Sequence, residues 1–256
     1  MNDSATMLRR NLKRAIRYPG LTLIVAALPI VFLLLFVYVF GGTLGAGLGL
    51  PSGGRAEYLA YVVPGILVLA ITGGAQGTAI GIAMDMTEGI IARFRTMSIA
   101  RASVLTGHVL GAVIQTMVGL ALVVAVALLI GFRPDANAVE WLAVIGVLTM
   151  TSFALSWLSV AMGLWTKTVE AASNLPMPLM LLPFLGSGFV PVASMPAGLR
   201  WFAENQPFTP IIETVRGLLT GTAIGSSATV ATAWCAGIAL AGYLWARRTY
   251  ERRPAR

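Results

Sequence analysis

Long apolar stretches separated by short polar segments occupy most of this 256-residue chain. An α-helix rises about 1.5 Å per residue, so about 20 apolar residues cross a hydrocarbon core of roughly 30 Å. By this measure the pattern predicts one all-α membrane domain, over residues 1–256, with six transmembrane helices. The predicted spans are residues 21–40, 58–84, 104–130, 141–165, 174–191 and 228–245.

The fifth apolar stretch differs from the others because three prolines and two glycines interrupt it. Proline removes a helical hydrogen bond and its ring clashes with the preceding turn, so this density of prolines forbids a straight helix. We therefore expect the fifth span to be kinked or partly unwound near its outer end. The residues concerned are Pro176, Pro178, Pro183, Gly186 and Gly188.

The segment after it, residues 193–226, contains two helical patterns that are too short to cross a membrane. Thr209 suits the cap of the second helix, Pro210 its first position and Gly221 its end. The sequence therefore predicts an external re-entrant or interfacial helical hairpin between spans five and six. The two helical patterns cover residues 196–205 and 210–220.

The N-terminal segment, residues 1–20, has an amphipathic pattern. Its apolar residues recur at helical spacing among basic residues, which predicts a helix that lies in the inner headgroup layer. The bases of this helix are Arg9, Arg10, Lys13, Arg14 and Arg17.

The polar segment between spans two and three, residues 85–103, combines two carboxylates with several arginines. Within it, residues 88–98 can form a short helix with one apolar face, and Asp85 with Glu88 suits a capping box at its start. Periodicity by itself equally favours a helix that docks on a partner and a loop that faces lipid headgroups. The apolar face consists of Ile90, Ile91, Phe94 and Met97, and Arg93 and Arg95 lie beside it.

Composition narrows the class of protein. The chain is 57% hydrophobic and 11% charged, whereas a soluble domain carries about 25% charged residues, so a sizeable soluble domain is excluded. The net charge of +8 does not indicate binding of nucleic acid, because the bases cluster beside the apolar spans rather than along one polar face. Membrane lipids are the expected surroundings.

The distribution of the bases predicts the topology. Of the 18 lysines and arginines, four fall in segments assigned to the outer side: Arg55, Arg133, Arg200 and Arg216. Cytoplasmic segments of membrane proteins carry the excess of bases. We therefore expect a multi-pass protein of the inner (plasma) membrane with both termini in the cytoplasm.

The chain contains no catalytic or metal-binding motif. It lacks a phosphate-binding loop, HExxH and GxSxG, and Cys235 is its one cysteine. His108 would need an intramembrane carboxylate to relay protons, and no acid lies in the middle of a predicted span, so we interpret it as a neutral interfacial residue. Any transport must then be driven by an energy source outside this chain. The 88–98 helix is the natural place for that source to act on the chain.

Several polar and small residues favour contacts between helices. Gln76 and Gln115 are more typical of hydrogen bonds between helices than of substrate contacts. In the hairpin, acidic and basic residues stand close enough in sequence to pair. The possible pairs involve Glu204, Glu213, Arg200 and Arg216, and a glycine ladder that lets another helix approach closely consists of Gly73, Gly77 and Gly81.

Two stretches resemble permeases of the ABC type-2 family. The segment through which those permeases enter their third span is similar to GIIARFRTMSIARASVLTGHVLG, residues 89–111, and their external hairpin is similar to NQPFTPIIETVRGLLTG, residues 205–221. Over nearly its whole length the chain resembles the daunorubicin/doxorubicin-resistance type of drug-export permease. It departs from the pattern at Gln206, which separates Asn205 from Pro207 where the family has Asn directly before Pro.

The resemblance implies a transport subunit that is not itself an enzyme and binds no cofactor. Two copies would form the translocation path as a homodimer, and a separate ATPase subunit with ATP and Mg would bind each copy. The 1–20 helix would serve as a gate helix and the 88–98 helix as a coupling helix. Span one of one copy would meet span five of the other. The dimer and pathway candidates are Leu33, Phe36, Gln76, Met180 and Phe184.

The expected substrate is a hydrophobic or amphipathic drug, antibiotic, secondary metabolite or lipid, because predicted spans two and five contain no charged residue. The alternative within the same class is a permease for envelope lipid or lipid-linked polysaccharide. The alternative from another class is a membrane interaction or immunity protein without transport.

Overall fold

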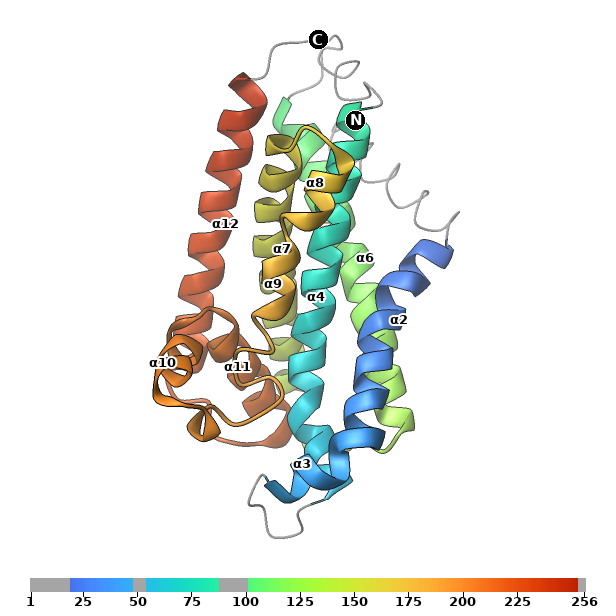
Figure 1. Cartoon of the computed structure of the whole chain (residues 1–256), viewed down its shortest axis with the longest axis vertical. Helices are drawn as coiled ribbons and strands as arrows, with labels where there is room; N and C mark the ends of the chain where they lie inside the picture. The colour runs from blue at the N-terminus through green and yellow to red at the C-terminus, as the bar shows by residue number, and fades with distance from the viewer. Residues whose placement is uncertain (1–18, 48–53, 88–100, 253–256) are drawn as a thin grey trace.

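The computed structural model describes residues 19–47, 54–87 and 101–252, and these residues form a bundle of long helices without strands (Figure 1). The predicted all-α class is therefore confirmed. Five helical stretches in the described part of the chain are long and apolar enough to cross a membrane. They are Ala26–Ala46, Arg55–Thr87, Leu105–Leu129, Ala138–Trp165 and Ser227–Arg252.

The first span is one bent helix. It consists of α2 (Pro19–Leu35), a π-helical turn η1 (Phe36–Phe40) and α3 (Gly41–Gly47). The expected end at residue 40 was wrong, because the glycine-rich stretch that follows remains helical. Glycine is a poor helix former, but α3 packs closely against the chain that enters the next helix. A Cβ on Gly45 would lie 2.5 Å from the carbonyl oxygen of Gly54.

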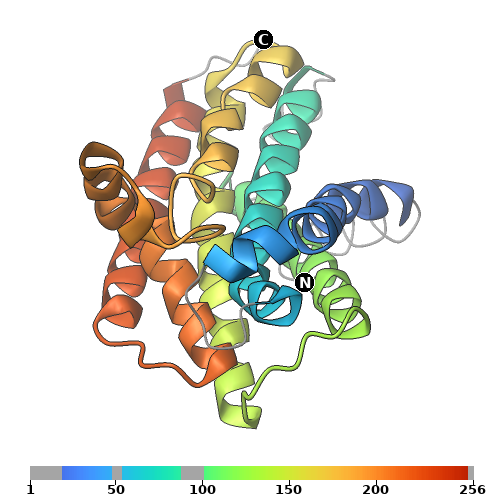
Figure 2. The ribbon, with the colours of Figure 1, turned by 60° about the horizontal axis from the view of Figure 1, so that its bottom comes forward.

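The centre of the bundle is α4 (Arg55–Thr87), which contacts α2, α6 (Arg101–Leu129) and α7 (Ala138–Trp165). The C-terminal helix α12 (Ser227–Arg252) packs mainly on α7, at the edge of the bundle (Figure 1 and Figure 2). These four helices are longer than the predicted spans at one or both ends.

Local chemistry explains two of these extensions. At the start of α7, the Asn137 side chain accepts hydrogen bonds from the backbone N–H groups of Val139 and Glu140, and the Glu140 carboxylate accepts from Asn137 N–H. This capping box begins the helix at Ala138 rather than residue 141. At the end of α12, Arg247 and Glu251 pair at 2.9 Å across one helical turn, so residues expected in a basic tail continue the helix.

The predicted fifth span, residues 174–191, is not a continuous helix. Around it the chain forms two short helices, α8 (Val169–Asn174) and α9 (Met177–Leu181), continues as turns and reaches the 3-10 turn η2 (Val192–Ser194). The predicted interruption is confirmed. It was too narrowly placed, since the helix also breaks around Pro176, well before the outer end.

The hairpin that follows contains α10 (Ala197–Asn205) and α11 (Phe208–Thr220), at the end of the bundle where α12 begins (Figure 1). Gly221 ends α11 in the left-handed conformation with φ of 68°, as expected of a glycine at this position. The expected cap Thr209 was wrong, because α11 already begins at Phe208 and Thr209 lies inside it.

Two apolar clusters hold the bundle together. The larger one centres on α4 and includes residues of α2, α7 and α11, and the smaller one lies at the end where α12 finishes. Within the larger cluster, the backbone of Gly65 on α4 lies directly against Gly188 of the broken span, since a Cβ on Gly65 would be 2.5 Å from the Gly188 carbonyl oxygen. The absence of a side chain at Gly65 therefore permits this contact.

Candidate functional site

The predicted gate and coupling helices lie outside the described residues, in segments 1–18 and 88–100. The structure does describe the two helices that the coupling segment connects, α4 up to Thr87 and α6 from Arg101. The gate-helix residues outside the description are Arg9, Arg10, Lys13, Arg14 and Arg17, and the coupling residues are Glu88, Ile90, Ile91, Arg93, Phe94, Arg95 and Met97.

A buried carboxylate–imidazole pair joins these two helices. Asp85 lies in the last turn of α4, and its Oδ2 is 3.1 Å from Nε2 of His108 on α6. The Asp85 and His108 side chains are 2% and 14% exposed. Two expectations are corrected: Asp85 belongs to α4 rather than to the polar segment after it, and His108 does have an acidic partner.

An aromatic cluster connects the first span with the broken fifth span. The rings of Phe184 and Phe189 stack with centroids 4.4 Å apart. Phe36, in the π-helical turn, lies 4.6 Å from Phe189 and 6.3 Å from Phe184, and Phe32 meets Phe184 edge-on at 5.7 Å. We expected spans one and five to meet between two copies, but Phe36 and Phe184 meet within one chain. A crosslink between this pair would therefore report the fold of the monomer.

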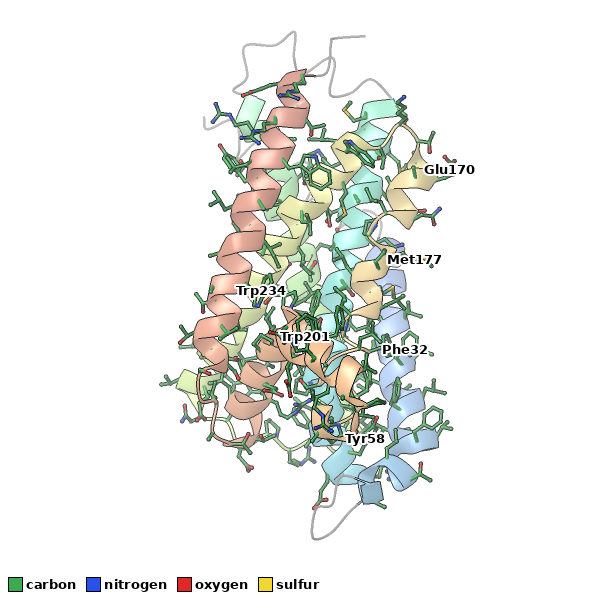
Figure 3. All side chains as sticks on the ribbon, turned by 60° about the vertical axis from the view of Figure 1, so that its left-hand side comes forward. Phe32, Tyr58, Glu170, Met177, Trp201 and Trp234 are labelled. Atoms are coloured by element: carbon green, nitrogen blue, oxygen red, sulfur yellow. The ribbon has the colours of Figure 1, made fainter. Side chains whose placement is uncertain are left out.

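The other dimer and pathway candidates differ in exposure. Leu33 is completely buried in the core of its own chain. Met180 is half-buried against the same core. Met177, one turn earlier on α9, and Leu181, the residue after Met180, are 57% and 58% exposed (Figure 3 labels Met177).

Gln76 makes the contact between helices that its residue type favours. Its Nε2 donates a 2.7 Å hydrogen bond to the carbonyl oxygen of Ser173, the residue before the end of α8. The interpretation as an interhelical partner is confirmed for Gln76, which fastens α8 to α4. The glycine ladder next to it is open among the described residues, because a Cβ built on Gly73, Gly77 or Gly81 would meet none of their atoms within 4 Å beyond the local helix backbone.

A partly buried arginine fastens the hairpin to the bundle. The Arg216 guanidinium of α11 lies 3.8 Å from the centroid of the Tyr61 ring on α4 and donates to the carbonyl oxygens of Tyr61 and Ser187. Burial lowers the pKa of Arg216, whereas the nearby Tyr61 and Glu213 raise it. The expected ion pairs are not the contacts observed, since Arg200 likewise donates to backbone, to the Ala193 and Met195 carbonyls.

Gln206, the departure from the resembled pattern, is itself a structural contact. Its side-chain amide donates to the Leu182 carbonyl oxygen at 3.0 Å and to the Thr209 hydroxyl at 3.3 Å, and the residue is 4% exposed. The amide lies so close to Gly186 that a Cβ there would overlap it. Gln206 therefore ties the hairpin to the broken span.

Residues 4–220 of the chain match the sequence profile of the family described as ABC-2 type transporter. This match covers well over half of the 256 residues. The chain belongs to the ABC-2 type transporter family.

Relatives of this ABC-2 type transporter chain are named as permeases. The daunorubicin resistance ABC transporter permease protein DrrB1 of Streptomyces coeruleorubidus is 30% identical over 208 residues, which cover 80% of this chain and 71% of that protein. The probable doxorubicin resistance ABC transporter permease protein DrrC of Mycobacterium tuberculosis is 26% identical over 177 residues, which cover 69% of this chain and 64% of that protein. The family resemblance is confirmed, and the chain is a permease subunit of an ABC exporter.

Sequence reasoning missed two contacts in this ABC-2 type permease, Asp85 with His108 and Arg216 with Tyr61. A signal for the first was present, because α4 and α6 are antiparallel neighbours joined by a short segment, so residues on either side of it can meet. No sequence signal indicated the second, which joins residues 155 positions apart.

Proposed function

We propose that this permease exports hydrophobic or amphipathic compounds, driven by ATP hydrolysis on a separate subunit. The observation that carries the proposal is the 30% identity to a permease named for daunorubicin resistance. Three polar side chains of the described bundle, those of Gln76, Arg216 and Asp85, make contacts within the chain. Most of the other buried side chains in the described helices are apolar, which suits an apolar substrate rather than a charged one.

We propose that the ATPase subunit binds through the coupling segment. With Phe94→Asp we expect normal membrane insertion but loss of co-purification with the ATPase and of drug export. An unpartnered charge and a lost aromatic anchor in a protein groove should weaken binding by about 2 kcal/mol or more, which is at least roughly thirtyfold. The measurements are pull-down of the ATPase from detergent extracts and daunorubicin efflux from cells.

Phe94→Leu is the matched control, because it keeps an apolar anchor at the same position, and it should retain most of the binding. If Phe94→Asp binds the ATPase and exports as the unchanged chain does, the coupling role moves to residues 8–17. Efflux of labelled lipid instead of daunorubicin by the unchanged chain would favour the lipid-permease alternative.

We propose six crossings with both termini in the cytoplasm. The course of the broken span supports this number: α7 ends and α12 begins at opposite ends of the bundle, so the chain between them must traverse its length (Figure 1). Along this route Glu170, Met177 and Trp201 follow one another from one end toward the other (Figure 3).

The topology can be tested with single cysteines on a Cys235→Ser background. Cysteines at Ser4 and Ala255 should resist an impermeant thiol reagent in intact cells, and cysteines at Ser52 and Ser194 should react. The physical reason is the excess of bases in the segments assigned inside. Labelling at Ser4 in sealed cells would contradict the six-crossing arrangement.

We propose that the permease works as a homodimer with one ATPase on each copy, and that the open glycine ladder of α4 contacts the second copy. Small residues spaced four apart let helices approach closely in a membrane, and Gly77 is exposed within its own chain. Gly77→Leu should leave the monomer folded and raise the monomer fraction at least tenfold, measured by light scattering during size-exclusion chromatography. An unchanged dimer fraction would place the interface on another face.

A further inference from the structure

The Asp85–His108 pair occupies a distinctive place in the bundle. Asp85 stands two residues before the end of α4, and His108 stands seven residues after the start of α6. The pair therefore joins these two helices next to the points where they enter and leave segment 88–100, whose sequence lies between them.

Apolar residues next to the pair in the sequence belong to the smaller buried cluster. They are Ile82, one turn before Asp85, and Leu105 and Val109, near His108. That cluster also contains Trp157 of α7 and Ala246 of α12, so it joins four helices. A carboxylate 2% exposed needs hydrogen-bond donors, and His108 Nε2 is one of the groups that face it, at 3.1 Å. The contact should therefore persist while the bundle remains folded.

We propose that Asp85 and His108 are positioning residues that clamp α4 to α6, so that a displacement of segment 88–100 moves both helices together. The inference rests on the proposed function, because it takes the ATPase to act on that segment. The consequence follows from the position of α4. This helix contacts α2, α6, α7, α8 and α11, so its movement would be passed to most helices of the bundle.

The first test measures the clamp without the ATPase. Nitroxide labels on cysteines at Thr87 and Ile114, on a Cys235→Ser background, report the separation of α4 from α6 in the full chain in lipid nanodiscs. Pulsed electron spin resonance should give one narrow distance distribution for the unchanged pair. His108→Leu should at least double its width, and the exchanged pair Asp85→His with His108→Asp should restore it.

The second test measures transmission in the complex of permease and ATPase. His108→Leu should bind the ATPase within about twofold of the unchanged chain, but daunorubicin-stimulated ATP hydrolysis and efflux should fall at least tenfold. His108→Gln, whose amide can still donate to Asp85, and the exchanged pair should recover at least half of the stimulation. The exchanged pair keeps the carboxylate–imidazole contact but changes the side-chain shape at both positions. Recovery of the stimulation by this pair would therefore show that the contact, and not the packing of His108, is required.

The outcomes are distinguishable. An unchanged distance distribution in His108→Leu, or full stimulation in that variant, would overturn the clamp while leaving the proposed function in place. Failure of the exchanged pair to recover either signal would assign His108 to packing and also overturn it. If the unchanged chain binds no ATPase, the proposed function fails, and the transmission role fails with it.

Discussion

Alanine at Gly65 is expected to destabilise the folded permease by about 3 kcal/mol, at the upper end of the usual cost of overpacking. The added methyl would lie 2.5 Å from the carbonyl oxygen of Gly188 and 2.9 Å from its carbonyl carbon. Backbone on both sides of this contact is held in place, since the Tyr58 hydroxyl donates to the Phe189 carbonyl at 3.2 Å and Arg216 donates to that of Ser187. The strain therefore cannot be relieved by a rotating side chain.

Thermal unfolding in detergent, followed by tryptophan fluorescence, should show a fall in Tm of roughly 6–12 °C for this change. Gly146→Ala on α7 is the control, because Gly146 is exposed and a Cβ there would meet no other described atom within 4 Å. That control should melt at or slightly above the unchanged protein, since alanine favours a helix over glycine by about 1 kcal/mol. Equal melting of both variants would mean that residues 182–190 are not held against α4.

Methionine at Arg216 is expected to cost about 4 kcal/mol. The change keeps an unbranched apolar stem but removes the charged donor to the Tyr61 and Ser187 carbonyls and the cation above the Tyr61 ring. A hydrogen bond to a charged group contributes about 1.5–3 kcal/mol, and a desolvated cation–π contact about 2 kcal/mol. The same melting experiment should show a drop of roughly 8–16 °C.

Arg200→Met is the matched control in the neighbouring helix. Arg200 is exposed and donates to carbonyls of its own turn region, so its loss should cost less than about 1 kcal/mol. Arg216→Lys should recover part of the loss, because an ammonium keeps the charge but lacks the planar fork that reaches two carbonyls. If Arg216→Met and Arg200→Met have the same Tm, the hairpin is held by apolar packing and not by the Arg216 guanidinium.

Both predictions concern contacts between segments far apart in the sequence. Gly65 and Gly188 carry no side chain, so the sequence does not indicate their contact. Arg216 lies three residues after Glu213, which is a nearer ion-pair partner in the sequence. Residues three apart on a helix are neighbours, and Glu213 raises the pKa of Arg216, but the donors of Arg216 reach carbonyl oxygens. Here the helix turns Arg216 toward α4, where a ring and two carbonyls surround it.

The sequence by itself determined the helical class, the starts of the long helices to within three residues, the interruption of the predicted fifth span and the two-helix hairpin. These properties follow from local causes: apolar length, proline chemistry and turn residues act over one or two helical turns. The family also could be recognised from sequence, because residues 89–111 and 205–221 carry side chains in a specific order.

Only the tertiary structure decided which polar groups meet and which surfaces remain open. The sequence pattern places Asp85 in the polar segment after the second predicted span. In the structure it is a buried partner of His108, because α4 continues through Thr87 and packs on α6. Phe36 and Phe184 meet within one chain because a π-helical turn and a broken span bring their rings together. Such contacts depend on helix length, rotation and packing distance at once, and the local pattern of residues does not specify these quantities.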